Sequence, residues 1–247
     1  MQLSRDPLFA SAGVVAVNRG LADAAGGPFL LTATAFRLLP AFAELPQSPP
    51  FAEPLAALPA SSAARAARQL AWPAGAAANE TLLWRVELLG AGGALISRSE
   101  YFLSSLETNI SAAGPPSMRA LSDARYGDGG GGLVALVATA AGAVGGSGGG
   151  GTLRVNVSVA LSASALRAAL AVRVSLRNLA APVRAATGFV DYRVLPQFPS
   201  DSYFALLPGE ARNVTIDCAA QGELDPLYVL VDAWNAAEVN ATVVMEG

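Results

Sequence analysis

Apolar and polar residues alternate along several segments of the chain. The clearest is 152–161, where Leu or Val occupies every second position and mostly polar residues lie between them. Because successive side chains of an extended strand point to opposite faces, this period of two predicts a strand with one buried and one solvent-exposed face. Residues 170–177 and 212–218 repeat the pattern. Shorter or less regular apolar runs predict further strands at 14–17, 29–39, 133–144, 187–195 and 227–234.

Two strands joined by a tight turn are predicted at 82–103. Glycines within 90–93 supply the turn, and Trp84 and Tyr101 are large rings at strand positions. An aromatic stripe can stack on a sugar, but core packing between sheets is the commoner use of such rings, so we expect core packing. The segment 61–71 is ambiguous, because its many Ala and Arg residues favour a helix by propensity.

The segment 194–210, which reads VLPQFPSDSYFALLPGE, organises the C-terminal half of the chain. Pro196 and Pro199 cannot donate to a strand ladder, so the backbone is expected to leave its sheet there. Residues 200–202 can shape a turn, and 207–210 fit a type II turn with Pro and Gly at its centre. Strand, kink, strand, turn and strand is the way a chain crosses between the sheets of a sandwich, so we interpret this segment as scaffold.

These strands, with turn signals between them and no long amphipathic helix, predict an all-β protein of two β-sandwich domains. Residues 1–107 are the first domain, within which the proline-punctuated segment 46–59 is expected to be a connection. A Gly/Pro-rich, low-complexity linker follows at 108–132. Residues 133–247 are the second domain, with a glycine-rich insertion at 145–151 that lacks the Lys and the spacing of a phosphate-binding loop.

Composition narrows the chemistry further. The chain has 247 residues and a formal charge of −3, which argues against a nucleic-acid partner. It has no His, which excludes Ser-His-Asp and Cys-His arrangements and His-based zinc sites within these residues. Cys218 is the one cysteine, so the chain forms no internal disulfide, and its strand register predicts a small core residue. We expect no cofactor and no metal site.

Five Asn-x-Ser/Thr sequons occur where chance predicts about one, which suggests possible N-glycosylation and a vacuolar or extracellular protein of the secretory pathway. The sequons start at Asn79, Asn109, Asn156, Asn213 and Asn240. The alternative is that Asn-x-Thr is simply common on the wet faces of strands. No apolar run of about 18 residues predicts a membrane span, and residues 1–6 lack the apolar core of a signal peptide.

Several motifs resemble one enzyme family. SDSYFALLPGE at 200–210, preceded by VLP and followed by Trp234-Asn235 at a strand end, resembles the C-terminal immunoglobulin-like domain of certain glycoside hydrolase family 2 enzymes. These are the exo-β-D-glucosaminidases and the plant-type mannosylglycoprotein endo-β-mannosidases. Ser202 stands where the family pattern has Asn, and Asp232-Ala233-Trp234-Asn235 replaces its GWN.

The first domain agrees with this resemblance. SRSEYFLS at 97–104 is similar to the strand that closes the preceding sandwich domain in the same enzymes. Residues 16–19 look like a turn near the start of that domain, which places Met1 close to a domain boundary, and 174–178 match a strand and turn early in the last domain. The glycine runs would then be insertions, and the resemblance favours a strand for the ambiguous segment 61–71.

The resemblance implies a retaining glycosidase with two catalytic Glu residues on a (β/α)₈ barrel. No segment here alternates strands with helices or matches the catalytic motifs, so neither Glu is carried over and no catalytic residue is expected. Glu210 and Asp201 are interpreted as a solvated and a turn-forming carboxylate. The expected partner is the catalytic barrel of the same parent polypeptide, and the chain alone is expected to be inactive, as a truncated or processed piece.

Two other readings stay open. A stand-alone carbohydrate-binding or adhesion module should expose two or more aromatic rings on one surface, whereas a piece of an enzyme should bury Trp72, Trp84 and Trp234. A hydrolase active in its own right should turn over aryl β-mannosides or β-glucosaminides.

Overall fold

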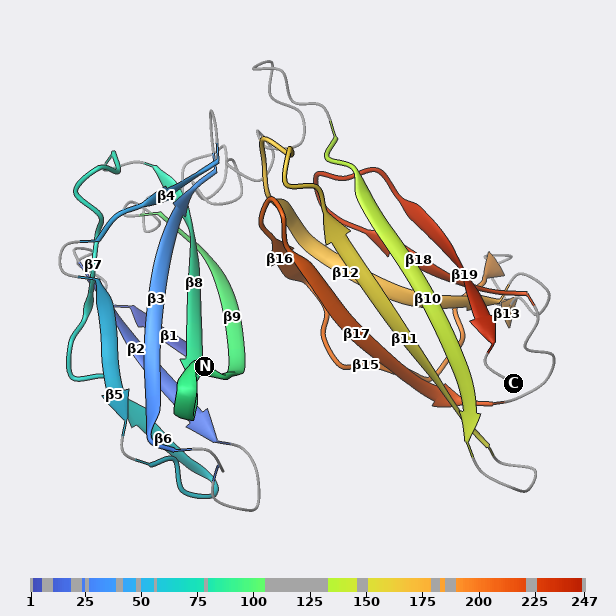
Figure 1. The fold of residues 1–247 in the computed structure, drawn as a ribbon, viewed down its shortest axis with the longest axis horizontal. Coiled ribbons are helices and arrows are strands. Elements are labelled where there is room, and N and C mark those ends of the chain that lie inside the picture. Colours follow the sequence, from blue (N-terminus) through green and yellow to red (C-terminus); the bar gives the residue numbers. More distant parts are fainter. Residues whose placement is uncertain are drawn as a thin grey trace. The chain divides into compact units, whose positions relative to one another are not determined.

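The computed structural model describes residues 2–5, 11–18, 24, 27–38, 42–47, 50–55, 57–77, 80–104, 133–145, 151–178, 183–184, 190–220 and 226–245. Within these ranges the chain is built of β-strands, with one short 3₁₀ turn at Ala91–Gly93 and no α-helix. It divides into an N-terminal unit, residues 1–130, and a C-terminal unit, residues 131–247, each with its own apolar core (Figure 1). The all-β prediction is confirmed.

The described strands of the N-terminal unit lie in two sheets. The first holds β1 (Gln2–Arg5), β2 (Ser11–Asn18), β6 (Ser62–Arg65) and β7 (Leu70–Ala71). The second holds β3 (Phe29–Arg37), β4 (Ala43–Leu45), β5 (Phe51–Leu55), β8 (Thr81–Leu89) and β9 (Leu95–Ser104). Val14 and Ala16 of β2 share one core with Leu31 of β3 and with Trp84 and Val86 of β8, so the two sheets pack face to face.

The β8–β9 hairpin is confirmed. Gly90 accepts a hydrogen bond from Gly93 N, and Gly92 and Gly93 take positive φ angles of 70° and 79° at the tip. Trp84 is 2% exposed and Tyr101 packs against the same core, so both rings serve packing as expected.

In this unit one ambiguity is resolved and one expectation needs correction. The ambiguous segment 61–71 contains β6 and β7, which pair with β2. Ser62 Oγ donates to Pro59 O rather than capping a helix. The connection expected at 46–59 contains β5, an edge strand on β3 in which Pro54 lies opposite Leu30. Proline is tolerated there because an edge strand leaves one row of N–H positions unpaired.

In the described part of the C-terminal unit, eight strands form one sheet in the order β15-β17-β11-β10-β19-β18-β12-β16. Their bounds are β10 (Leu136–Gly145), β11 (Thr152–Leu161), β12 (Ala169–Asn178), β15 (Gln197–Pro199), β16 (Phe204–Leu206), β17 (Ala211–Ala219), β18 (Leu227–Asp232) and β19 (Val239–Met245). Neighbouring strands run antiparallel except β10 and β19, which are parallel.

This sheet curls on itself. Val155 and Val157 of β11 lie in one core with Val172 and Leu176 of β12, although the two strands are far apart in the sheet order. We call it the curled sheet; its two halves act as the two layers of a sandwich. The strands predicted at 152–161, 170–177 and 212–218 are confirmed, and their apolar positions face this core.

Some strands of this unit differ from expectation. The last strand predicted from the sequence was 227–234, but β19 follows it in the chain and lies between β10 and β18. Of the strand predicted at 187–195, the described residues show only β14 (Val190–Asp191), paired with β13 (Val183–Arg184).

The segment 194–210 crosses between the halves of the curled sheet, as predicted. β15 pairs with β17 at one edge of the sheet, and β16 pairs with β12 at the other. Pro199 does not end pairing as expected: it belongs to β15, where an edge position tolerates it. The type II turn is confirmed, with Gly209 at φ 82° and Glu210 N donating to Leu207 O at 2.9 Å.

Two amide side chains complete the hydrogen bonding where strands end. Gln197 Oε1 of β15 accepts from Leu176 N at 2.7 Å, which links the edge strand to β12. Beyond the end of β18, buried Asn235 accepts from Leu170 N at 2.8 Å and donates to Ala168 O at 2.9 Å. Asn235, part of the motif that resembles the family, thus continues the pairing of β18 with β12 after the strand has ended.

Replacing Asn235 with Ala is expected to lower the free energy of unfolding by about 2–4 kcal/mol, because it leaves a buried N–H and a buried C=O without partners. Chemical denaturation of the purified chain measures this. Asn240→Ala, at an exposed position of β19, is the matched control and should change stability by less than about 0.5 kcal/mol. Equal stability of the two variants would contradict the role given to Asn235.

Cys218 is 3% exposed and lies in the core of the C-terminal unit, as its strand register predicted. Burial, with a smaller contribution from the Asp217 carboxylate, raises the pKa of its thiol. Since the thiolate is the reactive form, we expect iodoacetamide to leave the native protein unlabelled at neutral pH and to label it after unfolding. Rapid labelling of the native chain, followed by mass spectrometry, would contradict this burial.

Candidate functional site

The described sequons lie on the outer surface of the C-terminal unit. Asn156, Asn213 and Asn240 are exposed residues of β11, β17 and β19, whereas Asn79 and Asn109 lie outside the described residues. In each strand the hydroxyl residue of the sequon shares the face of its Asn, because residues two apart point the same way.

The sequons on β11 and β17 are paired across the two strands. Asn156 lies opposite Thr215, and Ser158 lies opposite Asn213. Thr215 Oγ1 donates to Asn156 Oδ1 at 3.3 Å. Each sequon therefore faces the other across the ladder, and Thr139 and Ala141 of β10 lie beside them.

N-glycosylation stays a prediction. If the chain is expressed through a secretory pathway, we expect glycans on Asn156 and Asn213, because both amides face solvent and a glycan here would displace no core residue. Glycopeptide mass spectrometry before and after enzymatic deglycosylation measures this. Asn156→Gln and Asn213→Gln should each remove one glycan, and an unmodified protein from such a host would contradict the prediction.

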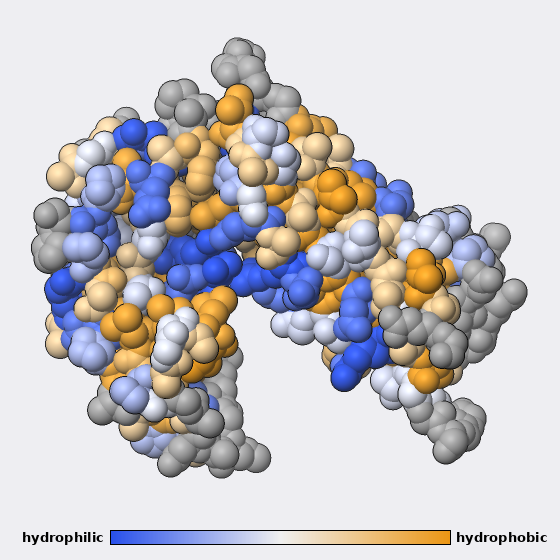
Figure 2. Space-filling model, viewed as in Figure 1, coloured by the Kyte–Doolittle hydropathy of each residue, from blue (hydrophilic) through white to orange (hydrophobic). Residues whose placement is uncertain are grey.

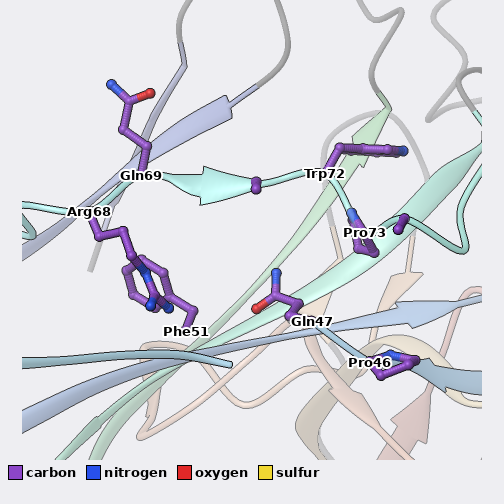
Figure 3. A pocket seen from close by; sticks show the side chains of 9 residues that line it. Pro46, Gln47, Phe51, Arg68, Gln69, Trp72 and Pro73 are labelled. Atoms are coloured by element: carbon purple, nitrogen blue, oxygen red, sulfur yellow. The ribbon is translucent and has the colours of Figure 1, made fainter. Parts of the chain in front are cut away.

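The second candidate site is a pocket of about 330 Å³ in the N-terminal unit (Figure 3). The segment that leads from β4 into β5 gives it Pro46, Gln47 and Phe51. The segment on either side of β7 gives it Arg68, Gln69, Ala71, Trp72, Pro73 and Ala74. Two stretches distant in sequence therefore meet here.

The walls of the pocket are fixed by packing. The Arg68 guanidinium lies 5.0 Å from the centre of the Phe51 ring, and its Nη2 donates to Pro50 O. Trp72 is half-buried, with its ring centre 6.4 Å from that of core Trp84 and its Nε1 donating to Ala77 O at 3.4 Å. These contacts hold an aromatic wall and a cation in place before any ligand arrives.

One polar atom in the pocket is unsatisfied. Gln47 Oε1 is buried and has no hydrogen-bond partner among the described residues. In Figure 3 the Gln47 side chain lies between Arg68 and Phe51 on one side and Trp72 and Pro73 on the other, while Gln69 points away from them. A buried acceptor without a donor is costly, so such an atom marks a place where a ligand or water belongs.

The pocket does not offer the acid–base chemistry of a glycosidase. None of its nine lining residues is Asp or Glu, and Arg68 is its charged member. In the described part of the chain there is also no group of three or more Cys, Asp or Glu residues able to hold a metal ion. The arrangement suits binding of a small polar molecule with an apolar face.

The carboxylates singled out from the sequence have local structural roles. Asp201 Oδ1 accepts from Ser202 N at 2.8 Å, and its other oxygen lies 3.2 Å from Arg212 Nη1. Glu210 is less solvated than expected, because its carboxylate accepts from Leu207 N at 2.9 Å and so closes its own turn.

The expectation that all three tryptophans are buried is wrong for Trp234. Trp84 is buried and Trp72 half-buried, but Trp234 is 38% exposed, and Phe198 and Tyr203 are more than 60% exposed. The phase of β18 carried this signal: Val229 and Val231 face the core, so Asp232 and Trp234 lie in the outward register. On the face seen in Figure 2, polar and apolar residues are interspersed over both units.

No sequence motif pointed to the pocket. Trp72 was expected only to be buried, and Gln47 and Arg68 belong to none of the motifs described above. The usable signal was the group of prolines around Gln47 and Trp72, which favours rigid, exposed backbone beside an aromatic ring.

Solved structures of the exo-chitosanase CsxA from Amycolatopsis orientalis resemble almost the whole chain. One matches with a TM-score of 0.63 and 18% sequence identity over 94% of this chain. A complex of the same enzyme with PNP-β-D-glucosamine matches with a TM-score of 0.64 and 19% identity over 97% of this chain. This chain shares the fold of part of an exo-chitosanase.

The match covers only 25–26% of the enzyme's own length. The fold implied by the motifs at 97–104 and 200–210 is thereby confirmed, while an identity below one fifth supports no statement about activity. No family model and no curated protein matches the sequence. No helix in the described residues is long and apolar enough to cross a membrane.

Proposed function

We propose that this chain is the non-catalytic C-terminal β-sandwich region of a family 2 glycoside hydrolase of the β-mannosidase or exo-β-glucosaminidase type. The observation that carries the proposal is the match of both units, in order, to one quarter of an exo-chitosanase. The motifs that resemble the family add support, because they lie in this same order along the chain. The catalytic (β/α)₈ barrel would belong to the same parent polypeptide.

The motif residues have the contacts expected of scaffold. Asn235 joins β18 to β12, Glu210 closes its turn, and Asp201 pairs with Arg212. A motif can be retained for such contacts without touching a substrate. These contacts support a role in holding the sandwich in shape beside a catalytic domain.

The carboxylates of the described residues argue against hydrolysis by this chain alone. Six of them lie 2.5–3.4 Å from an arginine nitrogen: Glu80, Glu87, Glu100, Asp201, Asp217 and Asp232. Among them, Arg154 lowers the pKa of Asp217 through hydrogen bonding and charge. A retaining glycosidase needs a carboxylic acid whose pKa is raised, so Asp217 is a poor candidate for the general acid.

The alternative is a stand-alone carbohydrate-binding or adhesion module. Its expected mark was two or more exposed aromatic rings on one surface, and the exposure of Phe198, Tyr203 and Trp234 supports the first part of that mark. Tyr203 also contacts Arg173, which pairs with Asp232 at 2.6 Å, so this ring lies beside a polar pair rather than on a purely apolar patch.

The size of the native polypeptide tests the proposal. An antibody raised against the C-terminal unit should detect, in extracts of the source organism, a band larger than the 25.0 kDa of this chain by at least a barrel of about 250 residues. A band near 25.0 kDa, after deglycosylation, would favour the stand-alone module.

The activity of the purified 247-residue chain is the matched control. We expect no turnover of aryl β-mannosides or aryl β-glucosaminides. Hydrolysis that a single Glu→Gln substitution abolishes would overturn the proposal, because the catalytic machinery would then lie within this chain.

A further inference from the structure

We infer that the pocket around Gln47 and Trp72 is a binding site for an uncharged sugar. The inference deepens the proposed function, since it gives the sandwich region a ligand of its own. It is carried by three features of the pocket: its aromatic wall, its unsatisfied amide and its charge.

The aromatic wall suits the apolar face of a pyranose ring. Trp72 is held by Trp84 behind it and by its bond to Ala77 O, while its half-exposed ring borders the pocket. Pro46 and Pro73 add rigid apolar surface on the side of Gln47 away from Arg68. A pocket of about 330 Å³ admits a small ligand and falls at the lower end of small-molecule sites.

The unsatisfied amide specifies hydrogen-bonding chemistry. Gln47 Oε1 requires a donor, and if the amide were turned round its Nε2 would equally require an acceptor. A sugar hydroxyl satisfies either orientation, because it both donates and accepts. A proline-rich peptide would also suit the aromatic and proline walls, but proline has a C=O and no N–H, so it satisfies the amide in only one of the two orientations, whereas a sugar hydroxyl satisfies both.

The charge of the pocket selects among sugars. Arg68 has five N–H donors, of which the bond to Pro50 O uses one, and no lining residue is acidic. A cation without a nearby carboxylate in the lining repels the ammonium group of glucosamine. The pocket therefore favours neutral saccharides, such as mannosides or N-acetylated glucosaminides, over glucosamine oligomers.

Binding of defined disaccharides to the purified 247-residue chain tests the inference. Mannobiose, N,N′-diacetylchitobiose and the glucosamine disaccharide are titrated by calorimetry and by chemical-shift mapping. We expect a neutral disaccharide to bind and the glucosamine disaccharide to bind at least about tenfold more weakly. Absence of binding by both neutral sugars, or preference for the glucosamine disaccharide, would overturn the inference.

Gln47→Leu separates binding from stability. It removes a buried atom that has no partner, so the chain should be at least as stable as the original, yet sugar affinity should fall about tenfold or more. Trp72→Ala should abolish binding, and Trp72→Phe should retain part of it, while Trp234→Ala in the C-terminal unit is the control that should leave binding unchanged. Unchanged affinity in Gln47→Leu, or binding of decaproline in place of sugars, would contradict the assignment.

The sugar-binding test and the test of native polypeptide size can fail independently of each other. If the chain binds sugar but the native polypeptide in extracts has a mass near 25.0 kDa, the sugar-binding inference would be supported and the proposed function contradicted. If the native polypeptide is larger but its C-terminal region binds no sugar, the proposed function would be supported and the sugar-binding inference contradicted.

Discussion

The C-terminal unit depends on one apolar core buried between the two halves of the curled sheet. Val155 and Val157 come from one half and Val172 and Leu176 from the other, so neither half can bury its face without its counterpart. Removing such surface from water is the main favourable contribution to folding, at about 25 cal/mol per Å². Backbone pairing positions the strands, but the shared core is what makes the halves face each other.

The polar side chains of the unit lie around this core, where they complete backbone hydrogen bonds at strand ends and pair with one another on the outer faces. Where strand pairing stops, Gln197 and Asn235 supply hydrogen bonds to the backbone of β12 that a further strand would otherwise supply. On the outer faces, arginine is the one basic residue type available, and cross-strand pairs such as Arg154 with Asp217 join adjacent strands. Because that pair is well exposed, it contributes more to the solubility and register of the strands than to stability.

The period-two pattern made the long strands predictable. Residues 152–161 and 212–218 alternate cleanly. Gly209 made its turn predictable, because this turn type requires a positive φ angle at that position. Local sequence patterns did not predict the structure of segments whose strand pairing depends on partners distant in the sequence. The Ala-rich segment 61–71 forms strands because β2 offers it a ladder, and β19 lacks clean alternation at its end, where Val243, Val244 and Met245 follow one another.

The pocket was beyond sequence reasoning for the same reason. Gln47 and Trp72 become neighbours only when β5 pairs with β3 and β7 pairs with β2, and no spacing rule links them beforehand. Trp234 is the opposite case, since the phase of its own strand already assigned it to the outer face. A prediction that followed the alternation through to the end of β18 would have found it exposed.

The position of β19 has a consequence for biosynthesis. This strand is the last of the described strands in the chain, yet it lies in the interior of the sheet order, between β10 and β18. When every earlier strand has left the ribosome, β19, the strand that joins β10 to β18 and so one half of the sandwich to the other, has not yet emerged. Until Val239–Met245 emerges, the nascent unit exposes two unpaired inner edges, and a chaperone or rapid release is the natural protection against edge-to-edge association.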